Sequence, residues 1–165
     1  MHTGTVSIDT LVPAPSSSSP QPYPDQKVGY GTCWKTIGLT GQYNTDYDAL
    51  IAACGTPTGM VRYTAPLTGV LDQTHKQDTY KVKLYGGLCY RALGAGDSTL
   101  SDLDIRIQKL DGALIADEMG RQPIAIVDDV KAWCQKSDED VDFLLVVDGP
   151  GNGRYEFGIW AAPKH

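Results

Sequence analysis

The segment 101–117, SDLDIRIQKLDGALIAD, constrains the fold more than any other part of the chain. Its apolar side chains Leu103, Ile105 and Ile107 occupy every second position, with charged or polar residues between them. Alternation with a period of two is typical of a strand that is buried on one face only. Asp111-Gly112 then predicts a tight turn, because this dipeptide tolerates positive φ. We therefore expect a β-hairpin with one face in a core.

Short apolar segments separated by turn residues continue on both sides of this hairpin. Residues 78–84 alternate clearly, and residues 143–147 form an apolar run typical of a buried central strand. Nine tyrosines and eighteen glycines, with only two phenylalanines, also favour strands over helices. Turn signals about every 8–12 residues are typical of a sandwich or barrel. We predict an all-β fold in which residues 61–165 form a β-sandwich.

Residues 29–60 differ from this pattern and predict a small helical cap. Asn44-Thr45-Asp46 supplies the side chains that begin helices, and Tyr47 to Cys54 have helical propensity. Gly55 is a suitable residue to end the helix. Leu50, Ile51 and Cys54 share one face of such a helix, which we expect to pack inward.

Four dispersed cysteines, none in a CxxC or CxxH pair, indicate disulfides rather than zinc or a redox motif. Sequence alone allows three pairings. We favour Cys33–Cys54 and Cys89–Cys134, because each pair lies within one predicted subregion; the first would staple the cap. Paired cysteines predict an oxidising compartment and hence an exported protein. The alternative is four buried free thiols in a cytosolic protein.

Residues 1–28 are predicted to form an N-terminal arm or tether, with a Pro/Ser-rich stretch at 13–24. The start of the chain has no basic or apolar leader region, so we expect export to depend on a leader that this chain does not carry. The stretch 5–12 alternates and allows a second interpretation, in which it is a strand that adds to the sheet edge of a neighbouring subunit. The apolar residues of this assembly arm are Val6, Ile8, Leu11 and Val12.

The charge of the chain bears on its partners. A net charge of −6 argues against nucleic acid and anionic lipid, and no apolar run approaches the roughly 20 residues that cross a bilayer. Carboxylates gather around the 101–117 hairpin and are hard oxygen ligands of the kind that calcium takes. The alternative is that Asp102 accepts backbone N–H groups of the preceding loop while Asp104 is solvated. The candidate calcium ligands are Asp97, Asp102, Asp104 and Asp117, with Glu118 beside them.

Three groups of motifs between about residues 69 and 160 resemble the bacterial pre-peptidase C-terminal type of domain. The first group matches a strand pair, the second the 101–117 hairpin and the third the closing hairpin. The matched residues are Asp78, Tyr80, Val82, Leu84, Gly87 and Tyr90; Ser101, Asp102, Leu103, Asp104, Ile105, Ile107, Asp111, Gly112, Leu114, Ala116 and Asp117; and Phe143, Leu145, Val147, Gly151, Gly153, Tyr155, Phe157 and Ile159. The resemblance implies a jelly-roll β-sandwich and an exported location. The cysteine-bearing region before Gly59 is not part of the usual domain.

The sequence offers little support for catalysis. Cys33-Trp34 faintly resembles the nucleophile motif of papain-like peptidases, but only His75 could serve as its base. Neither GxSxG nor HExxH occurs. We therefore predict a protein that is not an enzyme: a non-catalytic exported cell-envelope module for adhesion, surface display or assembly, with no required cofactor. One alternative is a subunit of a self-assembling polymer or shell that exchanges residues 5–12. The other is a calcium-dependent domain that binds a polysaccharide or a protein.

Overall fold

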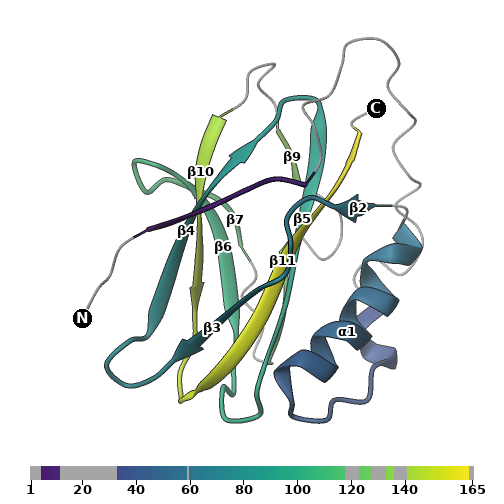
Figure 1. The fold of residues 1–165 in the computed structure, drawn as a ribbon, viewed down its shortest axis with the longest axis vertical. Coiled ribbons are helices and arrows are strands. Elements are labelled where there is room, and N and C mark those ends of the chain that lie inside the picture. Colours follow the sequence, from purple (N-terminus) through teal and green to yellow (C-terminus); the bar gives the residue numbers. More distant parts are fainter. Residues whose placement is uncertain are drawn as a thin grey trace.

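The computed structural model describes residues 5–11, 33–58, 60–117, 123–127, 133–135 and 141–163. Two β-sheets pack face to face, and one helix lies on the outer face of the second sheet (Figure 1). The first sheet has the strand order β1-β4-β10-β6-β7. Its strands are β1 (Val6–Ile8), β4 (Gln77–Leu84), β6 (Asp104–Lys109), β7 (Leu114–Asp117) and β10 (Val141–Asp148).

The second sheet has the strand order β2-β11-β5-β8, with β3 also paired to β11 and β9 to β5. From β3 to β6, and again from β10 to β11, each strand crosses to the opposite sheet. The predicted all-β sandwich is therefore confirmed. The strands of this sheet are β2 (Val61–Arg62), β3 (Leu67–Leu71), β5 (Leu88–Gly96), β8 (Ile124–Ile126), β9 (Trp133–Cys134) and β11 (Gly153–Pro163).

The predicted hairpin is formed by β6 and β7 in the first sheet. Leu103, Ile105 and Ile107 are all buried between the two sheets, as their alternation requires. Gly112 has φ of +95°, a conformation in which a side chain would be strained. The Lys109 N–H donates to the Ala113 carbonyl at 2.8 Å and closes the turn. A buried face and a glycine turn thus fix the register of the hairpin.

The helix α1 (Tyr43–Cys54) packs against β5 and β11, and the short 3₁₀ helices η1 (Cys33–Thr36) and η2 (Thr56–Thr58) flank it. It begins before the predicted capping residues, and Asp46 lies inside its first turn. The Asp46 carboxylate is buried and accepts the N–H groups of Thr40 at 2.8 Å and Gly41 at 3.0 Å. Asp46 therefore holds the preceding loop instead of starting the helix.

Two disulfides connect elements of the cap and of the second sheet. Cys33 is bonded to Cys54, which joins η1 to α1, and Cys89 is bonded to Cys134, which joins β5 to β9. These are the pairings that the sequence favours. A second apolar cluster forms around them, between the cap and the outer face of the sheet. The cap therefore covers a face that would otherwise expose apolar side chains.

The N-terminal segment bridges the two sheets. β1 runs parallel to β4, with Val6 opposite Tyr80 and Ile8 opposite Val82. Three residues further on, the Leu11 N–H donates to the Tyr63 carbonyl at 2.7 Å, next to β2 of the other sheet. Val12 and the Pro/Ser-rich stretch of the predicted arm lie outside the described residues.

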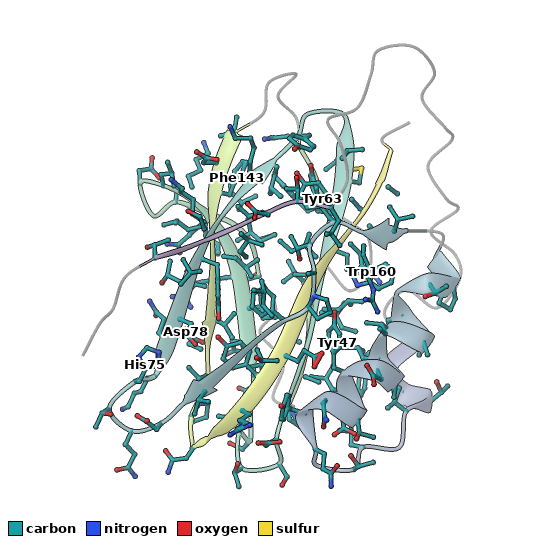
Figure 2. All side chains as sticks on the ribbon, viewed as in Figure 1. Tyr47, Tyr63, His75, Asp78, Phe143 and Trp160 are labelled. Carbon is teal, nitrogen blue, oxygen red and sulfur yellow. A yellow bond between two sulfur atoms is a disulfide. The ribbon has the colours of Figure 1, made fainter. Side chains whose placement is uncertain are left out.

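Four polar side chains contact one another in a row beside β4, and Figure 2 labels the first two of them, His75 and Asp78. His75 Nε2 and the Tyr155 hydroxyl contact the two carboxylate oxygens of Asp78. Because Tyr155 donates to a carboxylate, Tyr80 donates in turn to Tyr155, at 2.5 Å between the hydroxyl oxygens. Burial is the main cause that raises the pKa of Tyr155 above its ordinary value, and its hydrogen bond to Asp78 adds to it. The hydroxyl therefore stays protonated, as a donor must.

Gly69 makes space for this row of side chains. A Cβ at position 69 would lie 2.3 Å from the Tyr155 hydroxyl oxygen and 2.4 Å from its ring. We expect Gly69→Ala to lower the free energy of unfolding by about 1–3 kcal/mol, because it displaces a buried side chain whose partners are then left unpaired. Urea denaturation measures the change. Gly38→Ala is the matched control, since nothing lies within 4 Å of the added Cβ there. Equal stability of the two variants would contradict this account.

Candidate functional site

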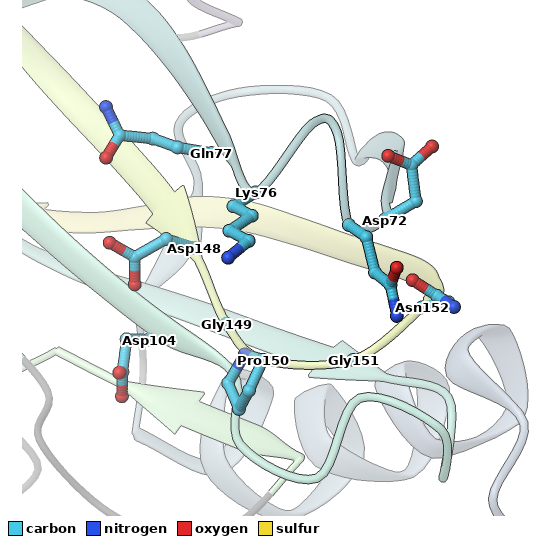
Figure 3. Close-up of a pocket in the computed structure, with 10 residues that line it drawn as sticks. Asp72, Lys76, Gln77, Asp104, Asp148, Gly149, Pro150, Gly151 and Asn152 are labelled. Atoms are coloured by element: carbon cyan, nitrogen blue, oxygen red, sulfur yellow. The ribbon is translucent and has the colours of Figure 1, made fainter.

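A cavity of about 510 Å³ lies at one end of the sandwich (Figure 3), and we call it the polar cavity because most of the residues that line it are polar or charged. The β3–β4 turn forms one wall with Asp72 and Lys76, and the loop 149–152 forms another. Asp104 and Asp148 line the remaining side, at the ends of β6 and β10. Figure 3 shows Lys76 between this pair and Asp72. The cavity thus combines three carboxylates with one ammonium group.

The β3–β4 turn is held by Asp72. Its carboxylate accepts the N–H groups of Thr74 and His75, both at 2.8 Å, and the Thr74 hydroxyl at 2.8 Å. These bonds, those from Thr74 foremost, lower the pKa of Asp72. This wall of the cavity is therefore fixed and carries a negative charge.

The loop after β10 is held by close backbone contacts. A Cβ at Gly149 would lie 2.2 Å from the Asp102 carbonyl oxygen, and one at Gly151 equally close to that of Thr99. Gly151 also has φ of +96°. Glycine is required at both positions because the loop lies directly against the segment that leads into β6. The two glycines therefore shape this wall of the cavity.

Three aspartates meet where β6 begins. Asp104 and Asp148 are direct neighbours across the β6–β10 pairing. Burial is the largest cause that raises the pKa of Asp104, and together with the charges of Asp102 and Asp148 it brings that pKa to about 6, while Arg106 opposes the shift. Arg106 Nη1 donates to Asp148 Oδ2 at 2.5 Å. The Oδ1 atoms of Asp102 and Asp104 are buried and lack a hydrogen-bond partner within the described residues.

The other predicted calcium ligands have different surroundings. The Asp97 carboxylate accepts the Tyr43 N–H with one oxygen and the Arg154 N–H with the other, both at 3.0 Å. It thus ties the start of α1 to the start of β11. Asp117 lies on β7 opposite Arg106, and Glu118 lies outside the described residues. The structure therefore brings Asp102 and Asp104 together, and gives Asp97 the loop-holding role that the sequence allowed for Asp102.

In the described part of the chain, no group of three or more His, Cys, Asp or Glu residues is arranged to hold a metal ion. Calcium binding therefore stays a prediction. The sequence did not single out Asp148, Asp72 or Lys76. Asp148 joins Asp104 only through strand register, which no local pattern encodes.

The suggested papain-like cysteine is accounted for by the fold. Cys33 is bonded to Cys54 and presents no thiol. His75, the only candidate base, contacts Asp78 in the β3–β4 region.

Comparison with known proteins found similarity among solved structures. No family model and no curated protein matches the sequence. Among solved structures, the chain is similar to the pre-peptidase C-terminal domain of a collagenase from Bacillus anthracis, at 11% identity and a TM-score of 0.45. The match covers 58% of this chain and 87% of that one. It is the same type of domain that the sequence motifs resemble. Among the described residues, no helix has the length and apolar character needed to cross a membrane.

The raised pKa of Asp104 predicts a pH-dependent stability. The folded state favours the neutral form of the Asp104 carboxyl. The contribution of this group to the free energy of unfolding is therefore fully present below about pH 4 and is lost as the pH rises through about 6. We expect Asp104→Asn to raise the free energy of unfolding by about 1 kcal/mol at pH 8, a value reduced by solvent screening, and to change it little at pH 4. Urea denaturation at both pH values measures this. Asp9→Asn, at an exposed carboxyl, serves as control; a gain at pH 4 equal to that at pH 8 would refute the assignment.

Proposed function

We propose that the chain is a non-catalytic, exported module that acts in adhesion, surface display or assembly at a bacterial cell envelope. The observation that carries the proposal is the use of all four cysteines in two disulfides. Disulfides persist in oxidising compartments and are rare in the cytosol. One of them fixes the cap and the other fixes β9, so both serve the fold.

The side chains at the surface support a binding role better than a catalytic one. The polar cavity offers carboxylates and one lysine, and hydrogen bonds hold the carboxylates of Asp72 and Asp148 in place. Asp78, His75 and the two tyrosine hydroxyls bond to one another along a path into the core. A rigid sandwich with charged hollows at its surface suits a module that holds a partner.

The proposal predicts association with envelope material. We expect the purified, oxidised protein to sediment with envelope fractions of the producing bacterium in a saturable manner. The proposal assumes that all four cysteines are disulfide-bonded, as in an exported protein. Thiol titration in denaturant checks this, and we expect it to find no free thiol. Four free thiols, or a protein that neither sediments nor self-associates, would overturn the proposal.

A second candidate function is assembly by strand exchange, and the position of β1 favours it. β1 adds a strand to the edge of β4, and Val6 is 54% exposed there. A neighbouring subunit could supply the same strand to this edge. We expect concentration-dependent oligomers, measured by analytical ultracentrifugation, that disappear when residues 1–12 are deleted. A monomer at all concentrations, unchanged by the deletion, would exclude this function.

A third candidate is calcium-dependent binding, with Asp102 and Asp104, whose side chains lie together, as the carboxylate ligands. A divalent cation between them would relieve the repulsion that raises the pKa of Asp104. At a calcium concentration 100-fold above Kd, we expect the melting temperature to rise by about 5–10 °C. The rise should vanish in Asp102→Ala. An unchanged melting temperature at saturating calcium would rule this candidate out.

A further inference from the structure

A second hollow, of about 820 Å³, lies at the opposite end of β6 and β10 from the polar cavity. The β6–β7 hairpin contributes Leu110, Leu114 and Ile115 to it. β9 contributes Trp133, and β10 contributes Phe143. We call this hollow, with those residues, the hairpin groove.

The hairpin groove has an ordered floor and exposed aliphatic sides. The Trp133 ring meets Phe143 edge to face, with 5.5 Å between the ring centroids, and so is held against the core. Leu110 and Leu114 are 57% and 56% exposed, among the highest values for large apolar residues in the described part. Exposure of two leucine side chains to water costs free energy in the isolated chain. A partner that covers them would remove this cost.

The rim of the hairpin groove carries more negative than positive charge. Among the described residues that line it, Asp111 and Asp142 are acidic and Lys109 is basic. Asp111 Oδ1 accepts the Ala113 N–H at 2.9 Å, which fixes that carboxylate at the tip of the turn. The whole chain has the same sign, with a net charge of −6. An occupant with basic groups beside its apolar part would complement this rim.

We infer that the hairpin groove docks a segment of a partner protein that inserts an apolar side chain between Leu110, Leu114 and Trp133 and places Lys or Arg beside Asp111 and Asp142. An apolar centre with a charged rim is the usual anatomy of such contacts. This inference rests on the proposed adhesion or assembly function and names the class of its partner.

The side chains favour a protein segment over a saccharide. Sugars are held by flat aromatic faces and by many hydrogen bonds, whereas the most exposed side chains here are those of Leu110 and Leu114. Leucine offers only an apolar contact, which suits another apolar side chain.

A random 12-residue phage-displayed peptide library, panned against the oxidised protein, tests the inference. We expect enriched peptides that combine Leu, Phe or Trp with Lys or Arg. Synthetic copies, measured by fluorescence anisotropy, should bind Leu114→Asp at least tenfold more weakly than wild type. Asp142→Asn should weaken binding about threefold and reduce its salt dependence. Val70→Asp, which changes a 52% exposed residue on β3 of the other sheet, is the matched control and should bind like wild type.

The inference fails if no peptide is enriched, if the peptides lack basic residues, or if Val70→Asp weakens binding as much as Leu114→Asp. It also fails if a glycan array gives ligands that compete with the peptides. Melting temperatures of the variants within a few degrees of wild type establish that they fold. The envelope assay separates the two proposals. If the wild type sediments with envelope fractions and Leu114→Asp sediments equally well, the docking role of the hairpin groove is wrong, while the proposed adhesion function still holds.

Discussion

The burial of β5 on both faces is the constraint on which the rest of the structure depends. All nine residues from Leu88 to Gly96 are buried. One face packs into the sandwich, and the other would meet water without the cap. The cap helix is short, and its burial against β5 and β11 stabilises it more than its own hydrogen bonds could. The Cys89–Cys134 disulfide attaches β9 to the same strand, and its cysteines join the apolar cluster under the cap.

Two carboxylates of the first sheet show how position decides what a charge can do. Asp78 has partners on both oxygens, from His75 and Tyr155, and so belongs to the packing of the core. Asp104 faces other carboxylates at the end of its strand, and burial with like charges raises its pKa. The first carboxylate fastens strands together. The second is costly for the fold whenever it is charged, so its neutralisation stabilises the protein.

The sequence was informative where a pattern is local. Alternation around Leu103 and the Asp111-Gly112 turn predicted a hairpin, and the structure has it, because a period of two leaves one choice of buried face. Strand register was not predictable, so the meeting of Asp104 with Asp148 was missed. The start of α1 was also misplaced, because Asp46 hydrogen-bonds to a loop rather than to the helix end. Such partners are set by tertiary contacts, which single positions do not encode.

The N-terminal strand β1 and the disulfide-bonded cap are attached to the sandwich by bonds of different mechanical strength. The N-terminal segment is held by noncovalent contacts: three residue pairs between β1 and β4, a bridge from Thr10 to Thr64, and hydrogen bonds from Leu11 to Tyr63 and between Thr10 and Tyr85. Beyond it, covalent bonds from Cys33 to Cys54 and from Cys89 to Cys134 shorten the path that tension can follow through the folded part. A pull on the N-terminal segment therefore loads the noncovalent contacts of β1 first, whereas the Cys33–Cys54 bond keeps the two ends of the cap joined. The protein could lengthen under load and keep its sandwich, and with it both hollows, folded.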